Sequence, residues 1–471
     1  MGRWSLVVVV VVVIAAAAGC GDNIAGPRFT DGAASGTRLK LRYYDFGSVR
    51  QLAGVRDTQR DEDCNPTEWA DGKAYCVPSN AYSPVYADAT CTQKVGMVFV
   101  QPDCTRLPFA YFIDYVHQAC EYKPARIYPR GAKLALTEFY RKNDDGSCSG
   151  PSDGSELDFY ALGPEVPVTD LAETMITQPS MTGRLGELYY ESIDGLRYPT
   201  GRMHDALLDG ACSLFYGLGA NLGRCVPFNN ASMYKFRDAA CTQLLATHST
   251  VCPVPKLAAK YGECPYHRTR YYEVTAKLPP TTVYVQSGMT CSPTAPAPES
   301  TNYDVGDEVM LATTSRTTGT GTDRIQPIHF TTPEGLRTRD SMLFDAQLGV
   351  ECSVRRQADG TALCMPGVYD YFETYYTDPG CANAIELVLV YHRQSCSPPP
   401  TSSYAVKYTQ TASCDDLSYE VRHAGTEFTG SLYWKNATTC TAINTTNYSM
   451  YRVGDVVPLG ELAAGALVTD P

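Results

Sequence analysis

Cysteine is the residue type whose spacing in this 471-residue sequence points most directly to chemistry. Cys20 follows an apolar N-terminal run, and the other eighteen cysteines fall into three groups of six. The groups are Cys64, Cys76, Cys91, Cys104, Cys120 and Cys148; Cys212, Cys225, Cys241, Cys252, Cys264 and Cys291; and Cys352, Cys364, Cys381, Cys396, Cys414 and Cys440. No pair has the close spacing of a structural zinc site or of a Cys-x-x-Cys redox motif. An even number of cysteines in an exported chain predicts structural disulfides.

The sequence leaves the pairing of these cysteines open. The simplest scheme joins neighbours, first with second, third with fourth and fifth with sixth, and keeps all nine bridges within their groups. The turn signal Asp71-Gly72 disagrees with it, because a two-residue hairpin there places Cys76 opposite Thr67 instead of Cys64. Either a bulge or a wider loop brings the two cysteines together, or Cys64 has another partner.

Six aspartates recur at fixed distances from the cysteines. One set lies seven residues before the first cysteine of each group, and the other lies three residues before the third. The two sets are Asp57, Asp205 and Asp345, and Asp88, Asp238 and Asp378. A catalytic site is needed once, whereas a turn must be capped in every copy, so we predict that these residues cap turns or backbone groups. Repeated calcium sites are the alternative, and no other cofactor is expected.

Motifs that would identify an enzyme are missing from the sequence. None of the seven histidines forms a His-Glu-x-x-His motif, and no Gly-x-Ser-x-Gly nucleophile elbow occurs. The sequence therefore assigns no catalytic residue and no metal ligand.

The cysteines and aspartates belong to three tandem copies of one unit, with a period of 148 and then 140 residues between first cysteines. Short β-branched and aromatic runs, such as residues 97–100 and 387–391, alternate with turn signals and predict an all-β fold. Two four-stranded meanders per unit would close into a six-bladed β-propeller. Three consecutive β-sandwich or barrel modules are the alternative. The Thr/Gly-rich segment 313–322 is interpreted as a free linker.

The N-terminus predicts export. Leu6 to Ala18 is a run of thirteen residues without a polar group, too short to span a bilayer as a helix. The end of this run and the two residues after it, Ala17-Ala18-Gly19-Cys20, resemble a bacterial lipobox, in which the cysteine is acylated and becomes the first mature residue. We divide the chain into a signal peptide (1–19), a lipidated tether (20–38) and three β repeats (39–184, 185–324 and 325–471).

The whole pattern resembles uncharacterised cysteine-rich repeat lipoproteins of Gram-negative bacteria. The resemblance rests on the Gly-Cys-Gly-Asp start at residues 19–22 and on four motifs found in the repeats. These motifs are Asp seven before Cys, Cys-x-Pro, an aromatic residue in Tyr/Phe-x-Asp-x-x-Cys, and Tyr-x-Leu/Val-Gly-x-x-Val. The resemblance implies lipidation and a repeat architecture, and it implies no catalytic residue.

The expected function is binding or structural support at the cell envelope. The net charge of −12 and the lack of a Lys/Arg run argue against a nucleic-acid partner. We expect an outer membrane lipoprotein, on the periplasmic side or the cell surface, held in the bilayer by acylated Cys20 and contacting a surface protein or glycan. The alternative is an exported glycan hydrolase with its active site on the central face of a propeller. Its carboxylates would be sought first in the acidic cluster of repeat 1, Asp61, Glu62, Asp63, Glu68 and Asp71.

Overall fold

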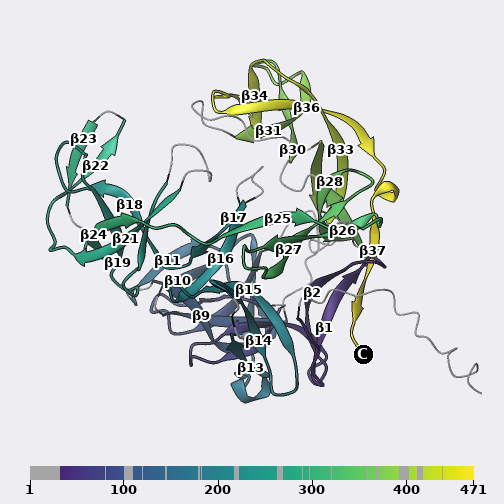
Figure 1. Ribbon diagram of the computed structural model, residues 1–471, viewed down its shortest axis with the longest axis horizontal. Coiled ribbons are helices and arrows are strands. Elements are labelled where there is room, and N and C mark those ends of the chain that lie inside the picture. Colours follow the sequence, from purple (N-terminus) through teal and green to yellow (C-terminus); the bar gives the residue numbers. More distant parts are fainter. Residues whose placement is uncertain are drawn as a thin grey trace, which may run out of the picture.

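The computed structural model is an all-β protein, which confirms the predicted fold class (Figure 1). The structure describes residues 32–471 except 80, 100–109, 119, 144–145, 179–180, 182, 217–221, 262–268, 289, 296, 320, 358, 367–370, 392–402, 411–416 and 437–438. Within these residues the helices are two single 3-10 turns, η1 (Val168–Asp170) and η2 (Leu459–Glu461). No helix in the described part of the chain has the length and apolar character needed to cross a membrane.

Five strands from each repeat form one closed barrel. From repeat 1 they are β1 (Leu39–Asp45), β2 (Arg50–Asp57), β3 (Glu62–Glu68), β4 (Ala74–Pro78) and β13 (Glu173–Thr177). Repeat 2 gives β14 (Leu185–Glu191), β15 (Arg197–Asp205), β16 (Gly210–Tyr216), β17 (Leu222–Pro227) and β25 (Thr313–Thr318). Repeat 3 gives β26 (Ile325–Thr331), β27 (Arg337–Asp345), β28 (Val350–Arg356), β29 (Thr361–Pro366) and β37 (Ala464–Thr469).

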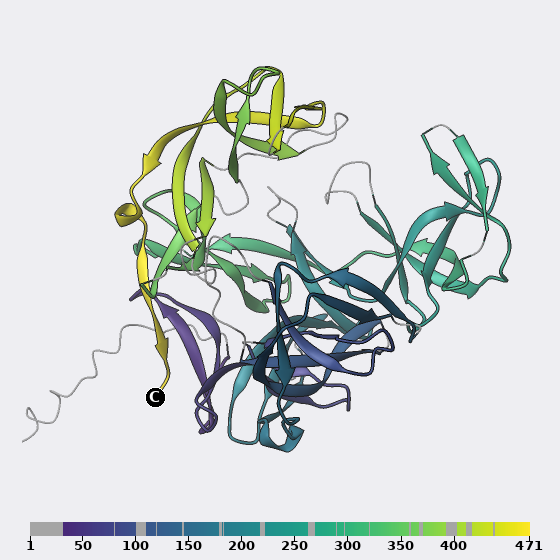
Figure 2. The ribbon, with the colours of Figure 1, turned by 180° about the vertical axis from the view of Figure 1, so that it is seen from behind.

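The remaining strands of each repeat form an outer lobe, inserted between the fourth and fifth barrel strands. Lobe 1 holds β5 (Ala81–Tyr82), β6 (Pro84–Tyr86), β7 (Lys94–Phe99), β8 (Tyr111–Gln118), β9 (Glu121–Leu134), β10 (Glu138–Lys142), β11 (Cys148–Asp153) and β12 (Leu157–Leu162). Lobe 2 holds β18 (Asn230–Phe236), β19 (Leu244–Ser249), β20 (Leu257–Lys260), β21 (Arg270–Lys277), β22 (Val283–Ser287), β23 (Thr290–Thr294) and β24 (Ser300–Glu308). Lobe 3 holds β30 (Phe372–Tyr376), β31 (Ala384–Tyr391), β32 (Tyr404–Gln410), β33 (Leu417–Glu427), β34 (Leu432–Asn436), β35 (Thr439–Ile443) and β36 (Tyr448–Val457). Lobes 2 and 3 project from the barrel on different sides (Figure 2).

The six-bladed propeller is not confirmed, and the alternative of β modules fits the three lobes. Each repeat forms one four-stranded meander that joins the barrel, followed by a lobe of seven or eight strands, instead of two four-stranded meanders. The fifth strand then returns to the barrel and pairs with the first strand of the next repeat. The last of these pairs, β37 with β1, runs from Arg42–Thr469 to Asp45–Ala466 and brings the two ends of the barrel sequence side by side.

The interpretation of residues 313–322 as a free linker is wrong. Most of this segment is β25, which pairs with β17 on one side and β26 on the other. Threonine is β-branched and suits a strand, so the composition was compatible with either state. Thr314 is buried in this strand.

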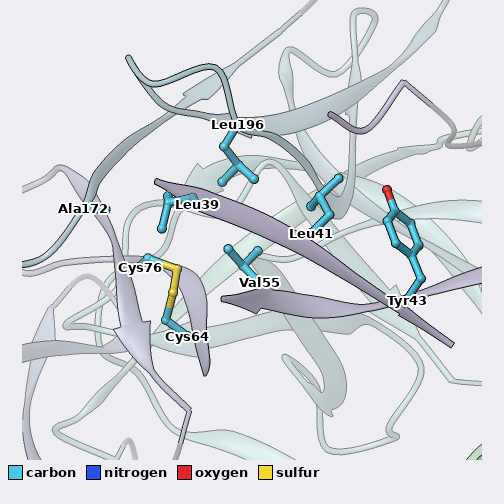
Figure 3. Close-up of a cluster of buried hydrophobic side chains, with 8 residues drawn as sticks. All are labelled: Leu39, Leu41, Tyr43, Val55, Cys64, Cys76, Ala172 and Leu196. Atoms are coloured by element: carbon cyan, nitrogen blue, oxygen red, sulfur yellow. A yellow bond between two sulfur atoms is a disulfide. The ribbon is translucent and has the colours of Figure 1, made fainter. Parts of the chain in front are cut away.

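Alternating apolar residues place the core on one face of the barrel strands. Leu39 and Leu41 in β1 are fully buried, and they pack with Val55 of β2 (Figure 3). Leu196, from the β14–β15 turn of repeat 2, joins the same cluster, so this core spans two repeats. Burying a leucine side chain contributes about 1.5–3 kcal/mol.

Pairing of neighbouring cysteines describes the first bridge of each repeat and none of the other described bridges. Seven disulfides lie within the described residues. First cysteines pair with second, as Cys64–Cys76, Cys212–Cys225 and Cys352–Cys364. Third cysteines pair with sixth, as Cys91–Cys148, Cys241–Cys291 and Cys381–Cys440. The third-with-fourth and fifth-with-sixth expectation is therefore wrong.

The seventh bridge, Cys120–Cys252, joins repeat 1 to repeat 2, so the expectation that every bridge stays within its group is also wrong. The predicted bridges of Cys104, Cys264, Cys396 and Cys414 fall outside the described residues.

The β3–β4 hairpin shows why Cys64 reaches Cys76. Trp69 and Lys73 close a three-residue loop in which Gly72 has φ +87°. This loop is one residue wider than a two-residue hairpin, so Cys76 lies opposite Pro66 and diagonal to Cys64. Their Cα atoms are 5.2 Å apart, within the range of a disulfide.

Candidate functional site

A cavity of about 330 Å³ lies where the three repeats meet. Gln51 of β2, Pro199 of β15 and Arg339 of β27 line it, and each lies six residues before the repeated aspartate of its repeat. The same strand segment of every repeat therefore borders one space. Since no single repeat encloses this space, the cavity exists only in the assembled barrel.

Charged residues line the cavity at four positions, and at each of these positions only one of the three repeats has a charged residue. They are Glu187, Arg202, Arg339 and Asp340. At the position of Glu187 the other repeats carry Leu41 and Pro327, and at the position of Asp340 they carry Leu52 and Thr200. A threefold scaffold thus surrounds a lining without threefold symmetry, which is the arrangement expected of a site needed once.

Glu187 and Thr338 join repeats 2 and 3 at this cavity, and both side chains are buried. The Thr338 hydroxyl donates a hydrogen bond to Glu187 Oε1 at 2.8 Å, and the Tyr189 hydroxyl donates to Oε2 at 2.5 Å. Both oxygens of the carboxylate already accept hydrogen bonds. These hydrogen bonds satisfy a buried polar group that would otherwise be costly.

Both oxygens of the Asp340 carboxylate also accept hydrogen bonds. Arg316 Nε, on β25, donates to Asp340 Oδ2 at 2.6 Å, and the backbone amide of Met342 donates to Oδ1 at 3.1 Å. Burial opposes the charge of Arg316, but hydrogen bonds and the charges of Glu351 and Asp340 raise the pKa of its guanidinium above the ordinary value.

The two remaining cations at the cavity also have partners. Arg202 Nη1 donates to Glu68 Oε1 at 2.9 Å, and Arg339 Nη1 donates to the backbone oxygen of Arg50 at 2.6 Å. A general acid or base needs a proton position that the substrate can reach. The hydrogen bonds of these four charged groups instead suit a rigid polar cavity that can hold a small polar molecule.

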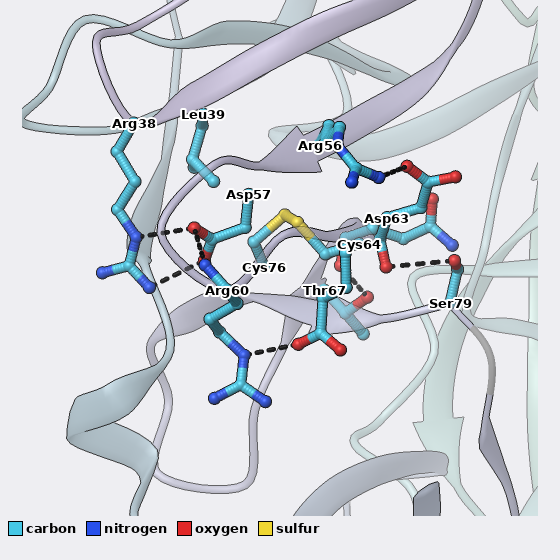
Figure 4. Close-up of a disulfide and its surroundings, with 12 residues drawn as sticks. Arg38, Leu39, Arg56, Asp57, Arg60, Asp63, Cys64, Thr67, Cys76 and Ser79 are labelled. Carbon is cyan, nitrogen blue, oxygen red and sulfur yellow. Dashed lines mark hydrogen bonds and ion pairs between the residues drawn. A yellow bond between two sulfur atoms is a disulfide. The ribbon is translucent and has the colours of Figure 1, made fainter. Parts of the chain in front are cut away.

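The structure places Asp57, Asp205 and Asp345 in ion pairs whose carboxylates are buried and whose arginines are partly exposed. Each carboxylate pairs with an arginine that directly precedes the first strand of its repeat, as Arg38–Asp57, Arg184–Asp205 and Arg324–Asp345. The aspartate side chains are at most 1% exposed. Figure 4 shows Arg38 facing Asp57 beside the Cys64–Cys76 bridge.

These aspartates also cap the turn that follows them. Asp57 Oδ1 accepts the backbone amides of Gln59 and Arg60, and Asp205 and Asp345 make the same two contacts in their own turns. The arginines donate further to backbone oxygens of the segment returning from each lobe, at Asp170, Met310 and Glu461. One ion pair per repeat thus connects the start of the repeat, a turn and the return segment.

Asp88, Asp238 and Asp378 organise the turn that carries the third cysteine. Asp88 accepts the Thr90 hydroxyl, the Gln93 amide and the amide and hydroxyl of Thr92. These hydrogen bonds, that of the Thr90 hydroxyl first, hold the pKa of Asp88 well below its usual range. The pKa values of Asp238 and Asp378 are lowered by corresponding hydrogen bonds. The cysteines that follow, Cys91, Cys241 and Cys381, have φ between +50° and +53°.

The acidic cluster of repeat 1 is divided among separate ion pairs and one turn. Asp61 and Asp63 pair with Arg56, and Glu62 pairs with Arg60. Glu68 contacts Lys123 and Arg202, and Asp71 accepts the Tyr75 hydroxyl. Among these five residues, Glu68 alone connects to the cavity, through Arg202.

His329, which no sequence motif marks, occupies the β26 position held by Tyr43 and Tyr189 in the other repeats. Its side chain is 1% exposed, and Arg337 Nη2 lies 3.0 Å from its Nδ1. Burial, followed by the charges of Arg337 and Arg339, lowers the pKa of His329 to about 4. The imidazole is therefore neutral at neutral pH.

The model of a family of unknown function, DUF7481, matches residues 11–462. No curated protein and no solved structure matches the chain.

Replacing Asp205 with Ala should lower the free energy of unfolding by about 3 kcal/mol, because Arg184 loses its partner and the turn loses its cap. Urea unfolding followed by circular dichroism measures this. Asp209→Gly is the matched control: Asp209 is 87% exposed at φ +46°, where repeat 3 has Gly349. The control should change stability by less than about 0.5 kcal/mol. Equal losses in both variants would contradict the role given to the ion pair.

The stability of the protein should fall on acidification between pH 6.5 and pH 4, because there the unfolded chain protonates His329 and the folded chain does not. Above pH 6.5 both states are neutral at this residue, so it adds no pH dependence. His329→Tyr, which restores the residue of the other repeats, removes this effect. Between pH 7.5 and pH 5 the wild type should lose about 2 kcal/mol more than the variant in urea unfolding. Parallel pH profiles for the two proteins would refute the assignment.

Proposed function

Because the chain belongs to DUF7481, a family of unknown function, we propose its role from its residues and their geometry. The protein is a lipid-anchored, disulfide-stabilised component of the bacterial envelope that binds another surface component and does not act as a catalyst. Its place is the outer membrane, on the periplasmic side or the cell surface.

The export and anchoring steps are supported by the cysteine chemistry. Seven disulfides among the described residues require an oxidising compartment, which for a bacterium lies outside the cytoplasm. Cys20 follows the small residues Ala17, Ala18 and Gly19 directly after the apolar run, as acylation requires. Cys20 itself lies outside the described residues.

The observation that carries the binding role is a set of exposed aromatic rings on lobe 3. Tyr371 and Tyr408 are 45% and 55% exposed, and their rings meet edge to face with centroids 5.5 Å apart. Tyr391 and Trp434 on the same lobe are also exposed. Aromatic rings with a polar edge provide large contact areas at low entropy cost, and they suit the apolar faces of sugar rings. A glycan is therefore the favoured ligand class.

The cavity supports binding over hydrolysis. Its carboxylates, Glu187 and Asp340, already accept hydrogen bonds from Thr338, Tyr189 and Arg316. A glycoside hydrolase needs one carboxyl group that donates a proton to the leaving group and a second that activates water or attacks the sugar. Because the hydrogen bonds hold Glu187 and Asp340 in the cavity wall, we assign neither residue such a role.

The lipid anchor predicts that the mature protein labels with radioactive palmitate and partitions into the detergent phase. Cys20→Ser should abolish both, because the acylated thiol is lost. Asp22→Ser in the same tether serves as the control and should label like the wild type. Labelling that survives in the Cys20→Ser protein would remove the anchor from the proposal.

The binding role predicts that the Cys20→Ser protein retains at least one ligand on an array of bacterial envelope glycans. Changing both Tyr371 and Tyr408 to Ser should weaken that binding about tenfold, equivalent to ~1.4 kcal/mol. Val456→Ser is the control, because Val456 is a 55% exposed apolar residue of the same lobe. An array without a bound glycan, or equal effects of the two changes, would count against a glycan ligand.

A further inference from the structure

The Cys120–Cys252 bridge connects lobe 1 of repeat 1 to lobe 2 of repeat 2. Cys120 lies at the tip of the β8–β9 hairpin, next to the terminal pair Gln118–Glu121, with φ +74°. Cys252 lies in the turn after β19, where its amide donates to the backbone oxygen of Ser249. Their Cα atoms are 4.9 Å apart. Among the described cysteines this is the one bridge that crosses between repeats.

The chain order repeats the same two positions in every lobe. The fifth cysteine of each group falls between paired strands: Cys120 between β8 and β9, Cys264 between β20 and β21, and Cys414 between β32 and β33. The fourth cysteine follows a strand that pairs with the last strand of its lobe: Cys104 after β7, Cys252 after β19, and Cys396 after β31. The first bridge therefore joins two positions that each repeat possesses.

We infer that the fifth cysteine of every repeat forms a disulfide with the fourth cysteine of the next repeat around the barrel. The three bridges are Cys120–Cys252, Cys264–Cys396 and Cys414–Cys104. The last four cysteines lie outside the described residues, so their pairing is inferred from the first bridge and from the repeat. Each bridge forms when two thiols lose two protons and two electrons. The electrons reduce the disulfide of an oxidised dithiol donor in the export compartment to its dithiol form.

Elimination leaves few alternatives. Seven bridges occupy fourteen of the eighteen cysteines, and Cys104, Cys264, Cys396 and Cys414 remain. Four cysteines allow three pairings. Of these, the pairing above alone repeats the relation of Cys120 to Cys252 in both remaining bridges. The other two are Cys264–Cys414 with Cys104–Cys396, and Cys396–Cys414 with Cys104–Cys264.

The consequence is covalent closure of the molecule. Hydrogen bonds between β37 and β1 close the barrel without a covalent bond. The Cys414–Cys104 bridge would join repeat 3 to repeat 1, so that every lobe is tied to both neighbours. Covalent bonds then limit how far the three lobes, and any ligand surface that they present, can move relative to one another.

A metal ion bound by Cys120 and Cys252 is the alternative to the disulfide between them. His248 lies beside the pair, and the ligand atoms of Cys120, His248 and Cys252 are all within 4.8 Å of one another. In thiol form such a set could bind zinc. His248 Nε2 lies 2.7 Å from Asn229 Oδ1, which orients the ring without any metal. The disulfide and the metal site predict different masses for the native protein, and the experiment below separates them.

The test is non-reducing peptide mapping of the full secreted chain by mass spectrometry, with native mass measurement for bound zinc. The expected result is the three crossing bridges, no zinc, and no free thiol other than the modified Cys20. The double variants Cys264→Ser/Cys396→Ser and Cys104→Ser/Cys414→Ser each remove a matched pair, so alkylation should detect no new thiol. The mismatched variant Cys264→Ser/Cys414→Ser should expose two thiols, or one new bridge between Cys104 and Cys396.

A second measurement applies if the variants do not fold. A protease site inserted at residues 319–322 of the wild-type chain separates repeat 3 from repeats 1 and 2 in the backbone. After cleavage the two parts should stay together on a non-reducing denaturing gel and separate after reduction. Release of repeat 3 without reductant, a Cys396–Cys414 or Cys264–Cys414 peptide, or zinc held by Cys120 and Cys252 would each overturn the inference.

Discussion

Closure of the barrel depends on strands that each repeat shares with its neighbour. β13, β25 and β37 pair on one side with a strand of their own repeat and on the other with the first strand of the next. An unpaired strand edge exposes a row of N–H and C=O groups, so a repeat alone would leave its barrel sheet incomplete. The central cavity and the contact between Thr338 and Glu187 therefore exist only because the ring closes.

The Arg–Asp pairs act at the points where the chain enters and leaves this ring. In repeat 1, Arg38 contacts buried Asp57 and the backbone of Asp170, where the chain returns from lobe 1. A few residues on, Ala172 accepts the backbone amide of Cys76, and Ala312 and Ala463 do the same for Cys225 and Cys364. A buried charge that loses its partner is costly. The Arg38–Asp57 pair therefore disfavours any path of the chain in which the start of the repeat and the segment returning from its lobe lie apart.

Local spacing allowed the structural role of the cysteines and the repeat to be predicted, but it determined neither the bridges beyond the first of each repeat nor the strand order. The offsets of Asp57 and Cys76 from Cys64 are short-range features of two adjacent hairpins, β2–β3 and β3–β4, and can be read from sequence. By contrast, Ala74 of β4 pairs with Thr174 of β13, a hundred residues away. Alternation of apolar residues predicts a strand without naming its neighbour, and a propeller and a barrel can be built from the same short strands.

The candidate site could also be predicted only in part from the sequence. Arg38, Arg184 and Arg324 each directly precede the first apolar strand of a repeat, a signal that alignment of the repeats could have revealed. The cavity could not be found by that route, because its charged residues stand where the other repeats have unrelated ones, such as Leu41 opposite Glu187. Residues that all repeats share build the ring, whereas residues that only one repeat has line its centre. A search for function in a protein of this kind should therefore begin at the positions where its repeats differ and yet are buried, of which Glu187, His329 and Asp340 are the clearest.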